Sequence, residues 1–515
     1  MPVTIPIRTQ SRFCKRPGWR CNTWTFPRRT HANPSTTNEG HSRRLTPLEH
    51  TMTNTSPSVL KMPAGFLWGV ATAAHQNEGR NRNNQWAAWE AKPNRIYRGQ
   101  RAGAATAWWD ISPELDVSLE TAAADFDRAA ELGLNSLRLS VEWSRIEPAE
   151  GVFDYSALHK YAEMIGLLCA RGLEPMVTLH HFTDPLWLTE KGAWENPLTE
   201  DYFSRFVERV VDALGDQVIL WCTINEPIVY AYNGFLEGVF PPGARSLPRT
   251  IKVLRRMLLA HGRAYRTIHR MQSDAQVGLA HSMRVFLPAN PASAVDRRAA
   301  ALLDRISNRT TLDAITAGRL APPVGFGETV TYLMDSCDYI GLNYYTTIHV
   351  AFDPTRPGLF FTRMFFDPSA ELSDTVPGDT EAYGEINPGG LYLALKRLAT
   401  YGKPIYITEN GVPDHDDDVR PRFIATHLAE AWRAIQEGVD LRGYYHWTLV
   451  DNFEWAAGWD LPFGLFELDR ETGVRTPKAS SAVYGRIAQA NGVPCELLEQ
   501  VAPASVSRYF GGEYT

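Results

Sequence analysis

The chain of 515 residues has 44% hydrophobic and 21% charged residues, the composition of an ordinary soluble protein. No apolar run approaches the roughly 20 residues that a bilayer-spanning helix needs, which argues against a membrane protein. The net charge of −6 is uneven, because residues 1–60 carry nine Lys and Arg against two acidic residues. The acidic remainder argues against a nucleic-acid partner, which requires a basic face.

The basic segment 1–60 is predicted to be a disordered N-terminal extension. It is rich in Arg, Pro, Thr, Ser and Asn and shows neither helical nor strand periodicity. It lacks the apolar core of roughly 7 to 15 residues that marks a secretory signal, so a cytoplasmic location is the default expectation. An organelle transit peptide, and a true start at Met52 or Met62, stay open as alternatives.

Beyond residue 62, short apolar runs alternate with longer amphipathic ones, a pattern typical of parallel strands joined by crossover helices. The predicted strands are 66–71, 136–141, 175–179, 219–224, 276–280, 339–343, 404–408 and 443–447. The predicted helices are 122–132, 156–170, 202–214, 251–271, 391–400 and 423–437. Eight such units close a single (β/α)8 TIM barrel of the α/β class.

The barrel is expected to form one domain over residues 61–495, followed by a C-terminal tail at 496–515. Glycines follow five predicted helices where a C-terminal stop is expected, at Gly133, Gly172, Gly215, Gly402 and Gly438. The long segments before the second strand and at 353–387 are rich in Gly, Pro and aromatic residues. We interpret them as long active-site loops between strand and helix, not as separate domains.

The six cysteines show no CxxC pair and no zinc-ligand spacing, so a reducing compartment is the simpler interpretation. Cys169 and Cys222 stand among apolar neighbours and are expected to be buried free thiols. No Gly-rich phosphate loop or nucleotide fingerprint is present. We therefore expect no cofactor and no metal.

Two glutamates directly follow predicted strands, where the chemistry of a barrel of this kind is located. The run WCTINEP ends the fourth strand with Asn225 and Glu226, and YITENG ends the seventh with Glu409. Either glutamate alone could equally form a structural ion pair. Together, across one barrel, they fit acetal hydrolysis, in which one carboxyl protonates the leaving oxygen and the other attacks the anomeric carbon. A separation of about 5 to 5.5 Å would give retention of configuration.

Seven motifs resemble glycoside hydrolase family 1, the β-glucosidase and β-galactosidase family, over nearly all of residues 62–491. They are FLWGVATAAHQNEG, LRLSVEWSRIEP, TLHHFTDPLWL, TINEP, DYIGLNYYT, YITENG and HWTLVDNFEWAAGW. The resemblance implies a retaining β-glycosidase that removes terminal nonreducing β-D-glycosyl residues, with Glu226 as acid/base and Glu409 as nucleophile. The expected partners are small β-glycosides or short oligosaccharides, and a homo-oligomer is left open.

The same resemblance assigns further site residues. Asn225 joins the catalytic group, while Arg138 and Tyr345 are expected to lower the pKa of the nucleophile. The alternative for Arg138 is an ion pair with Glu142 or another neighbour. The implied substrate-binding residues are Gln76, His181, Asn343, Trp447, Glu454, Trp455 and Phe463, with Trp447 as the stacking platform.

Several neighbouring residues refine this interpretation. Phe182 stands where many relatives carry Trp, and His180 is expected to be a core or supporting residue. The Glu454 carboxylate can accept from hydroxyls 4 and 6 of glucose but would repel a 6-phosphate. DNFEWAAGW also lacks the Ser, Lys and Tyr of the phosphoglucosidases, and a Glu instead of a Gln at position 226 argues against the myrosinase branch.

Two other functions stay open at this point. A transglycosylase would use the same residues and differ only in its acceptor site. A noncatalytic sugar-binding barrel would keep the aromatic platform but is disfavoured by the presence of both glutamates. The preference among glucose, galactose and fucose is not predicted, nor is the aglycone. Trp143, Trp187 and Trp194 are expected in the core more than in an aglycone funnel.

Overall fold

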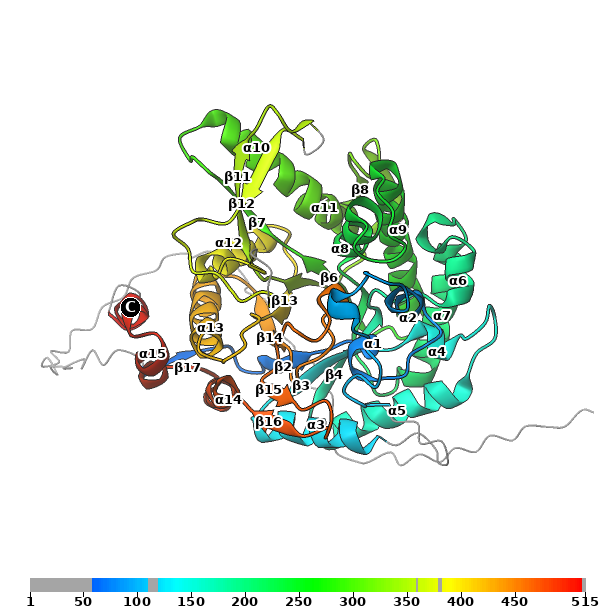
Figure 1. Cartoon of the computed structure of the whole chain (residues 1–515), viewed down its shortest axis with the longest axis horizontal. Helices are drawn as coiled ribbons and strands as arrows, with labels where there is room; N and C mark the ends of the chain where they lie inside the picture. Colours follow the sequence, from blue (N-terminus) through cyan, green and yellow to red (C-terminus); the bar gives the residue numbers. More distant parts are fainter. Residues whose placement is uncertain (1–57, 110–118, 358–359, 378–381, 512–515) are drawn as a thin grey trace, which may run out of the picture. The chain divides into compact units, whose positions relative to one another are not determined.

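The computed structural model describes residues 58–511 except 110–118, 358–359 and 378–381 (Figure 1). Most of the predicted extension 1–60 therefore lies outside the described residues. Its last residues do not, because β1 (Val59–Lys61) pairs antiparallel with β17 (Gly492–Pro494). The folded unit thus begins before the predicted boundary.

Eight parallel strands close a barrel, which confirms the predicted fold class. In order around the ring they are β2 (Leu67–Ala71), β3 (Ser136–Ser140), β4 (Glu174–His180), β5 (Leu220–Asn225), β6 (Gln276–Ser282), β10 (Tyr339–Asn343), β13 (Ile405–Asn410) and β14 (Leu441–Trp447). Each coincides with a predicted apolar run to within about two residues. These runs are apolar because helices cover the outer face of the sheet and side chains fill its interior.

Figure 1 shows the helices around this barrel. The six predicted ones are α3 (Glu120–Glu131), α5 (Tyr155–Ala170), α7 (Thr199–Leu214), α9 (Leu247–Met271), α12 (Pro388–Ala399) and α13 (Arg420–Gln436). Three more helices of eight residues or longer are not among the predicted ones: α10 (Ala294–Asp304), α11 (Thr310–Ala317) and α14 (Ala479–Ala490). Among the described residues, no helix is long and apolar enough to cross a bilayer.

Four of the five predicted glycine stops have a left-handed backbone, at Gly133, Gly172, Gly402 and Gly438. Gly215 also ends its helix but keeps a right-handed φ of −61°. A Cβ there would lie 2.6 Å from the Val211 carbonyl oxygen, so lack of space, not backbone handedness, calls for glycine. The predicted stop at Gly215 is therefore correct, although its backbone differs from that of the other four glycines.

Shorter elements connect these units. The helical ones are α1 (Ala74–Asn77), α2 (Gln85–Glu90), η1 (Tyr97–Gly99), α4 (Trp143–Ile146), α6 (Leu186–Glu190), η2 (Ala193–Glu195), α8 (Pro227–Tyr232), η3 (Asn233–Glu237), η4 (Arg305–Arg309), η6 (Trp455–Ala457) and η7 (Pro503–Ser505). The strands outside the barrel are β7 (Val285–Pro288), β8 (Gly318–Leu320), β9 (Glu328–Met334), β11 (Thr347–Phe352), β12 (Thr362–Phe365), β15 (Phe466–Leu468) and β16 (Arg475–Pro477).

The long segment 353–387 is more than a loop, because β12 pairs with β11 in a three-stranded sheet that also contains β7. The predicted tail contains α15 (Cys495–Val501) and α16 (Val506–Phe510). The Tyr509 hydroxyl, on α16, donates to Glu430 on α13 at 2.7 Å. The C-terminal segment therefore packs on the barrel's outer helices.

Tyrosine rings fill part of the barrel interior, and glycines on the strands make room for them. A Cβ on Gly69 would lie 2.5 Å from the Tyr445 ring, and one on Gly278 would lie 2.5 Å from the Tyr339 ring. Of the two thiols expected to be buried, Cys222 is buried and Cys169 is exposed. Cys169 lies near the end of α5, so its side chain is on the outer layer and not in the barrel.

Candidate active site

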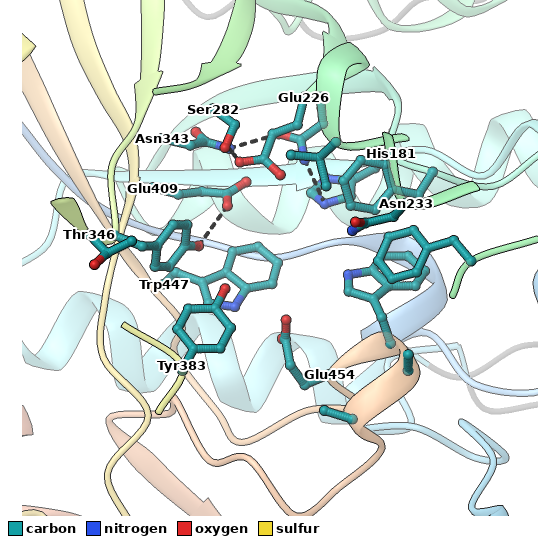
Figure 2. A pocket seen from close by; sticks show the side chains of 18 of the residues that line it. His181, Glu226, Asn233, Ser282, Asn343, Thr346, Tyr383, Glu409, Trp447 and Glu454 are labelled. Atoms are coloured by element: carbon teal, nitrogen blue, oxygen red, sulfur yellow. Dashed lines mark hydrogen bonds between the residues drawn. The ribbon is translucent and has the colours of Figure 1, made fainter. Parts of the chain in front are cut away.

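A cavity of about 280 Å³ is present at the carboxyl ends of the barrel strands (Figure 2). Nine of the residues predicted for the site line it: His181, Asn225, Glu226, Asn343, Tyr345, Glu409, Trp447, Glu454 and Trp455. Figure 2 shows Glu226, Ser282 and Asn343 at one end and Glu454 at the other, with Glu409 between them. The structure therefore brings both candidate carboxylates into one space.

Glu226 stands at the junction of β5 and α8 in a left-handed conformation, with φ of 43°. Its N–H donates to the Ala280 carbonyl at 2.8 Å, and Pro227 then begins the helix. This conformation is uncommon for a residue with a side chain and is concentrated at functional sites. The turn places the Glu226 carboxyl group in the cavity.

The Glu226 carboxyl group is buried close to a second negative charge. Burial and the charge of Glu409 raise its pKa to about 7, against hydrogen bonds from Asn343 and Ser282 that lower it. The Asn343 amide donates to Glu226 Oε1 at 3.0 Å. A large fraction of Glu226 is therefore protonated near neutral pH, as a general acid requires.

Glu409 lies near the end of β13 with a different set of neighbours. Arg138 Nη1 donates to its Oε1 at 2.6 Å, and the Tyr345 hydroxyl donates to its Oε2 at 2.7 Å. Burial raises the pKa of Glu409, while the charge of Arg138 and the hydrogen bond from Tyr345 act in the opposite direction. These two contacts favour the ionised form, the form in which a carboxylate acts as a nucleophile.

Arg138 is fully buried on β3 and reaches three strands. Besides Glu409, its guanidinium donates to Asn225 Oδ1 at 2.6 Å and to Thr178 Oγ1 at 3.1 Å. The alternative ion pair with Glu142 does not form. Glu142 instead accepts from Ser144 Oγ at 2.6 Å at the start of α4.

Asn343, at the end of β10, connects the two halves of the site. Its Nδ2 donates to Asn225 Oδ1 at 3.2 Å as well as to Glu226, and its Oδ1 accepts from Thr408 Oγ1 at 2.7 Å. Its side chain also lowers the pKa of Glu409 through a hydrogen bond. One amide thus contacts groups from β5 and β13.

Glu454 lines the far end of the cavity, and Gln76, which is buried and does not itself line the cavity, hydrogen-bonds to it. Gln76 Nε2 donates to the Phe453 carbonyl at 2.9 Å and to Glu454 Oε2 at 3.4 Å. Its Oε1 is buried and has no partner among the described residues, so one hydrogen-bond acceptor next to Glu454 is unsatisfied. Burial and the charge of Glu409 raise the pKa of Glu454 to about 8, against hydrogen bonds from Trp447 and Gln76.

His181 lies between two indole rings on the cavity wall. Its ring stacks on Trp447 with centroids 5.8 Å apart and on Trp455 at 6.1 Å. Its Nε2 contacts Asn225 Nδ2 at 3.1 Å, whereas its Nδ1 has no partner in the described part of the chain. Burial, with Arg138 nearby, lowers the pKa of His181, so the ring stays neutral and can hydrogen-bond a sugar hydroxyl.

Some predicted residues lie elsewhere. His180 faces away from the cavity and pairs with the buried Asp184 at 3.0 Å, as expected of a supporting residue. Phe463 does not line the cavity, because its ring packs behind Tyr383 at a centroid distance of 5.2 Å and behind Tyr345 at 6.1 Å. In this structure its ring packs against the two tyrosines, and its predicted contact with substrate stays a prediction. Trp143, Trp187 and Trp194 are buried outside the cavity.

The sequence interpretation missed several residues that line the cavity, among them Asn233, Ser282, Arg284 and Tyr383. Ser282 ends β6, so inspection of that strand's end could have found it. Tyr383 comes from the long segment 353–387, where no periodic pattern marks a single position.

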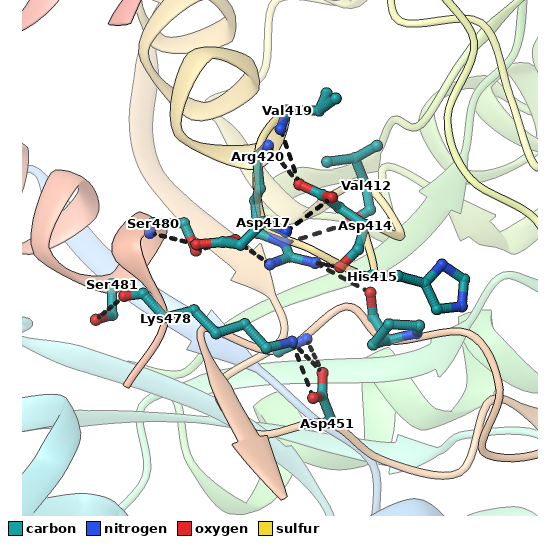
Figure 3. Close-up of polar contacts among 12 residues, drawn as sticks. Val412, Asp414, His415, Asp417, Val419, Arg420, Asp451, Lys478, Ser480 and Ser481 are labelled. Carbon is teal, nitrogen blue, oxygen red and sulfur yellow. Dashed lines mark hydrogen bonds and ion pairs between the residues drawn. The ribbon is translucent and has the colours of Figure 1, made fainter. Parts of the chain in front are cut away.

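A buried ionic network holds the segments that follow β13 and β14 (Figure 3). Asp414 accepts from the backbone N–H of Arg420 at 2.8 Å at the start of α13. The Arg420 side chain is fully buried and donates to the Asp414 and Pro462 carbonyls at 2.8 and 3.1 Å. Pro462 lies on the segment after β14 that also carries Glu454. The network therefore connects this segment to the one that follows β13, the strand that carries Glu409.

Asp414, with Asp416 and Asp418, also forms a group of carboxylates within metal-ligating distance of one another. None of the three lines the cavity, and Asp416 and Asp418 are exposed. Asp414 is already used to cap α13.

A family model described as Glycosyl hydrolase family 1 matches residues 59–493. The chain belongs to glycosyl hydrolase family 1. Beta-glucosidase A of Thermotoga maritima is 32% identical over 466 residues, which cover 85% of this chain and 99% of that protein. The beta-galactosidase of Pyrococcus woesei is 30% identical over 513 residues, covering 85% and 99%. Family 1 membership agrees with the resemblance of all seven motifs.

Solved structures of family 1 agree with the fold. The beta-glycosidase from Pyrococcus horikoshii matches with a TM-score of 0.75 and 37% sequence identity, covering 86% of this chain and 98% of that one. The beta-glucosidase from Thermotoga maritima in complex with glucoimidazole matches with a TM-score of 0.75 and 31% identity, covering 84% and 100%. The family 1 barrel therefore accounts for nearly the whole described part of the chain.

Proposed function

We propose that this protein is a retaining β-glycosidase of the β-glucosidase type, with Glu226 as acid/base and Glu409 as nucleophile. The observation that carries the proposal is the contrast between two carboxyl groups in one cavity. Glu226 has a pKa raised to about 7, while Glu409 is held by Arg138 and Tyr345. Opposed environments of this kind divide the acid and nucleophile roles.

In the first step, Glu226 donates its proton to the glycosidic oxygen as that oxygen leaves the anomeric carbon. A Glu409 oxygen attacks the same carbon, which gives a covalent glycosyl-enzyme and a free aglycone alcohol. The negative charge of Glu409 is one of the causes that raise the pKa of Glu226. Its loss in the ester lowers that pKa, so Glu226 becomes the base.

In the second step, Glu226 takes a proton from water as the water oxygen attacks the anomeric carbon. The Glu409 ester breaks, the carboxylate returns, and the sugar leaves with its original β configuration. The overall change is hydrolysis of one glycosidic bond. Two inversions give retention, which requires the two carboxyl groups to lie on opposite sides of the anomeric carbon.

For the glycone we propose a neutral, nonreducing β-D-sugar, with β-glucosides as the main class and β-galactosides and β-fucosides as further substrates. The named relatives include both a beta-glucosidase and a beta-galactosidase. Gln76, His181 and Glu454 provide unpaired polar atoms or carboxyl oxygens, and Trp447 provides a flat apolar surface. Such a combination suits a ring with several hydroxyls and one apolar face.

The direct test replaces the nucleophile. Glu409→Gly should abolish hydrolysis of 4-nitrophenyl β-glucoside, and added azide should restore turnover with an α-glycosyl azide as the product. A matched control is Glu471→Gly, which removes an exposed carboxylate in a turn and should hydrolyse the substrate like the wild type. Undiminished activity in Glu409→Gly would refute the assignment.

Two alternatives give different results in the wild-type protein. A transglycosylase would transfer the sugar to added alcohols or sugars in preference to water. A noncatalytic sugar-binding barrel would bind glucose without turnover. Proton NMR of the first-formed anomer tests retention, since the β anomer must appear before mutarotation. An α anomer formed first would contradict the double-displacement mechanism.

A further inference from the structure

One arginine at the cavity wall has no role in the proposed reaction. Arg284 follows β6 by two residues and is exposed. It is the only Lys or Arg among the described residues that line the cavity. Its guanidinium has no hydrogen bond or ion pair with any described residue. The backbone is fixed, however, because Asn308 Nδ2 donates to the Arg284 carbonyl at 2.8 Å.

The ring of strands places Arg284 away from the glycone end. Gln76 follows β2 and Glu454 follows β14, two neighbouring strands, whereas β6 is the fourth strand along the ring from β2. In an eight-stranded barrel β6 is therefore opposite β2 and three strands away from β14. Ser282, the last residue of β6, lies beside Glu226 at the end of the cavity remote from Glu454 (Figure 2). Arg284 therefore belongs to the side where the protonated oxygen leaves.

No described residue forms an ion pair with Arg284, although the Glu237 carboxylate also lies in this neighbourhood. Burial raises the pKa of Tyr383, and the charge of Arg284 opposes that rise, which places the guanidinium near the phenol. The same holds for Tyr232, whose hydroxyl is hydrogen-bonded to Glu237. Both phenols are uncharged near neutral pH. The nearby cavity carboxyls, Glu226 and Glu409, are committed to the reaction.

A cation exposed without a partner at this place has a consequence for substrate choice. An anionic substituent would meet repulsion from the Glu409 carboxylate and from the ionised fraction of Glu226, which a neutral aglycone does not. Arg284 provides the compensating charge and a planar guanidinium that fits a carboxylate or another oxyanion in a bidentate manner. A neutral alkyl or aryl leaving group would form no ion pair with this charge.

We propose that Arg284 is a specificity-determining residue of the leaving-group site and selects aglycones that carry an anionic group, above all an aromatic carboxylate. The inference rests on the proposed β-glycosidase function. The inference specifies the class of leaving group and changes no bond-making or bond-breaking step of the proposed reaction. Arg284 contacts the aglycone substituent and not the reacting atoms, so its effect is expected in KM more than in kcat.

The test compares 4-carboxyphenyl β-glucoside with its methyl ester, which is similar in shape and uncharged. The measured quantity is the ratio of kcat/KM for the acid to kcat/KM for the ester. Arg284→Gln should lower this ratio about fivefold, as expected for loss of one exposed ion pair. Arg284→Lys should keep most of it, and added salt should lower the ratio in the wild type.

The control is Arg297→Gln, which removes an exposed arginine on α10 that does not line the cavity. It should leave the ratio at the wild-type value. An unchanged ratio in Arg284→Gln, or an equal fall in Arg297→Gln, would overturn the inference. In either case, hydrolysis of the methyl ester would still support the proposed function. If the folded wild type hydrolyses neither compound, the proposed function fails and the inference fails with it.

Discussion

Replacing Glu226 with Gln removes the acidic proton but keeps the shape of the side chain. With a pKa of about 7, half of Glu226 is protonated at pH 7, and this fraction falls about tenfold for each pH unit above that. At its ordinary value of 4.5, only about one molecule in 300 would carry the proton at pH 7. The raised pKa thus increases the working population by about two orders of magnitude.

In the wild type, kcat/KM should therefore fall above pH 7, as Glu226 loses its proton. It should also fall at low pH, where Glu409 gains one, and this limb should lie above pH 4.5 because the pKa of Glu409 is raised. Glu226→Gln should lose the basic limb. Its kcat/KM for a substrate with a poor leaving group, such as methyl β-glucoside, should drop by roughly 10² to 10⁴.

The assay is a pair of pH profiles, one with methyl β-glucoside and one with 2,4-dinitrophenyl β-glucoside. The activated substrate needs little protonation of its leaving oxygen, so Glu226→Gln should affect its glycosylation step far less. A variant that keeps the basic limb at the same pH would refute the assignment of Glu226. Equal losses on both substrates would point instead to damaged binding.

Three further changes test the electrostatics of the site. Arg138→Met leaves Glu409 buried without its counter-charge. It should lower the free energy of unfolding, measured by urea denaturation, by about 3 to 5 kcal/mol, and it should shift the acidic limb of the pH profile to higher pH. Unchanged stability would argue against the buried pair. Ser282→Ala removes a hydrogen bond that lowers the pKa of Glu226, so the basic limb should move to higher pH by up to about one unit. The folded-state pKa of Glu454, about 8, lies above its ordinary 4.5, so the wild type should lose stability as pH rises between these values. Glu454→Gln does not titrate and should gain melting temperature relative to the wild type between pH 5 and pH 9; a constant difference would contradict the raised pKa.

The sequence predicts the barrel well because each strand is buried on both faces and is therefore almost wholly apolar. It does not predict the sheet formed by β7, β11 and β12, which lies outside the barrel. In these short strands the apolar and polar residues follow no regular period. The C-terminal helices α15 and α16 were missed because they are only seven and five residues long. Helices of that length form through tertiary packing more than through local preference.

The same distinction applies to the site. Glu226, Glu409 and Asn343 end barrel strands and could be found from the sequence, because the fold places strand ends together. Arg284 belongs to a connecting segment, and its approach to the cavity depends on the path of the chain after β6. The ring of Phe463 packs against Tyr345 and Tyr383, and its predicted role in substrate binding stays a prediction.

The side chain of Asn343 has a consequence for engineering this protein. It comes from a barrel strand and contacts Asn225, Glu226 and Thr408, with a further hydrogen bond to Glu409. The spacing between acid and nucleophile is thus set by the barrel frame, independently of the surrounding connections. An exchange of segment 353–387 between homologues to alter the acceptor or aglycone should therefore keep Tyr383, whose ring packs against Tyr345 beside Glu409.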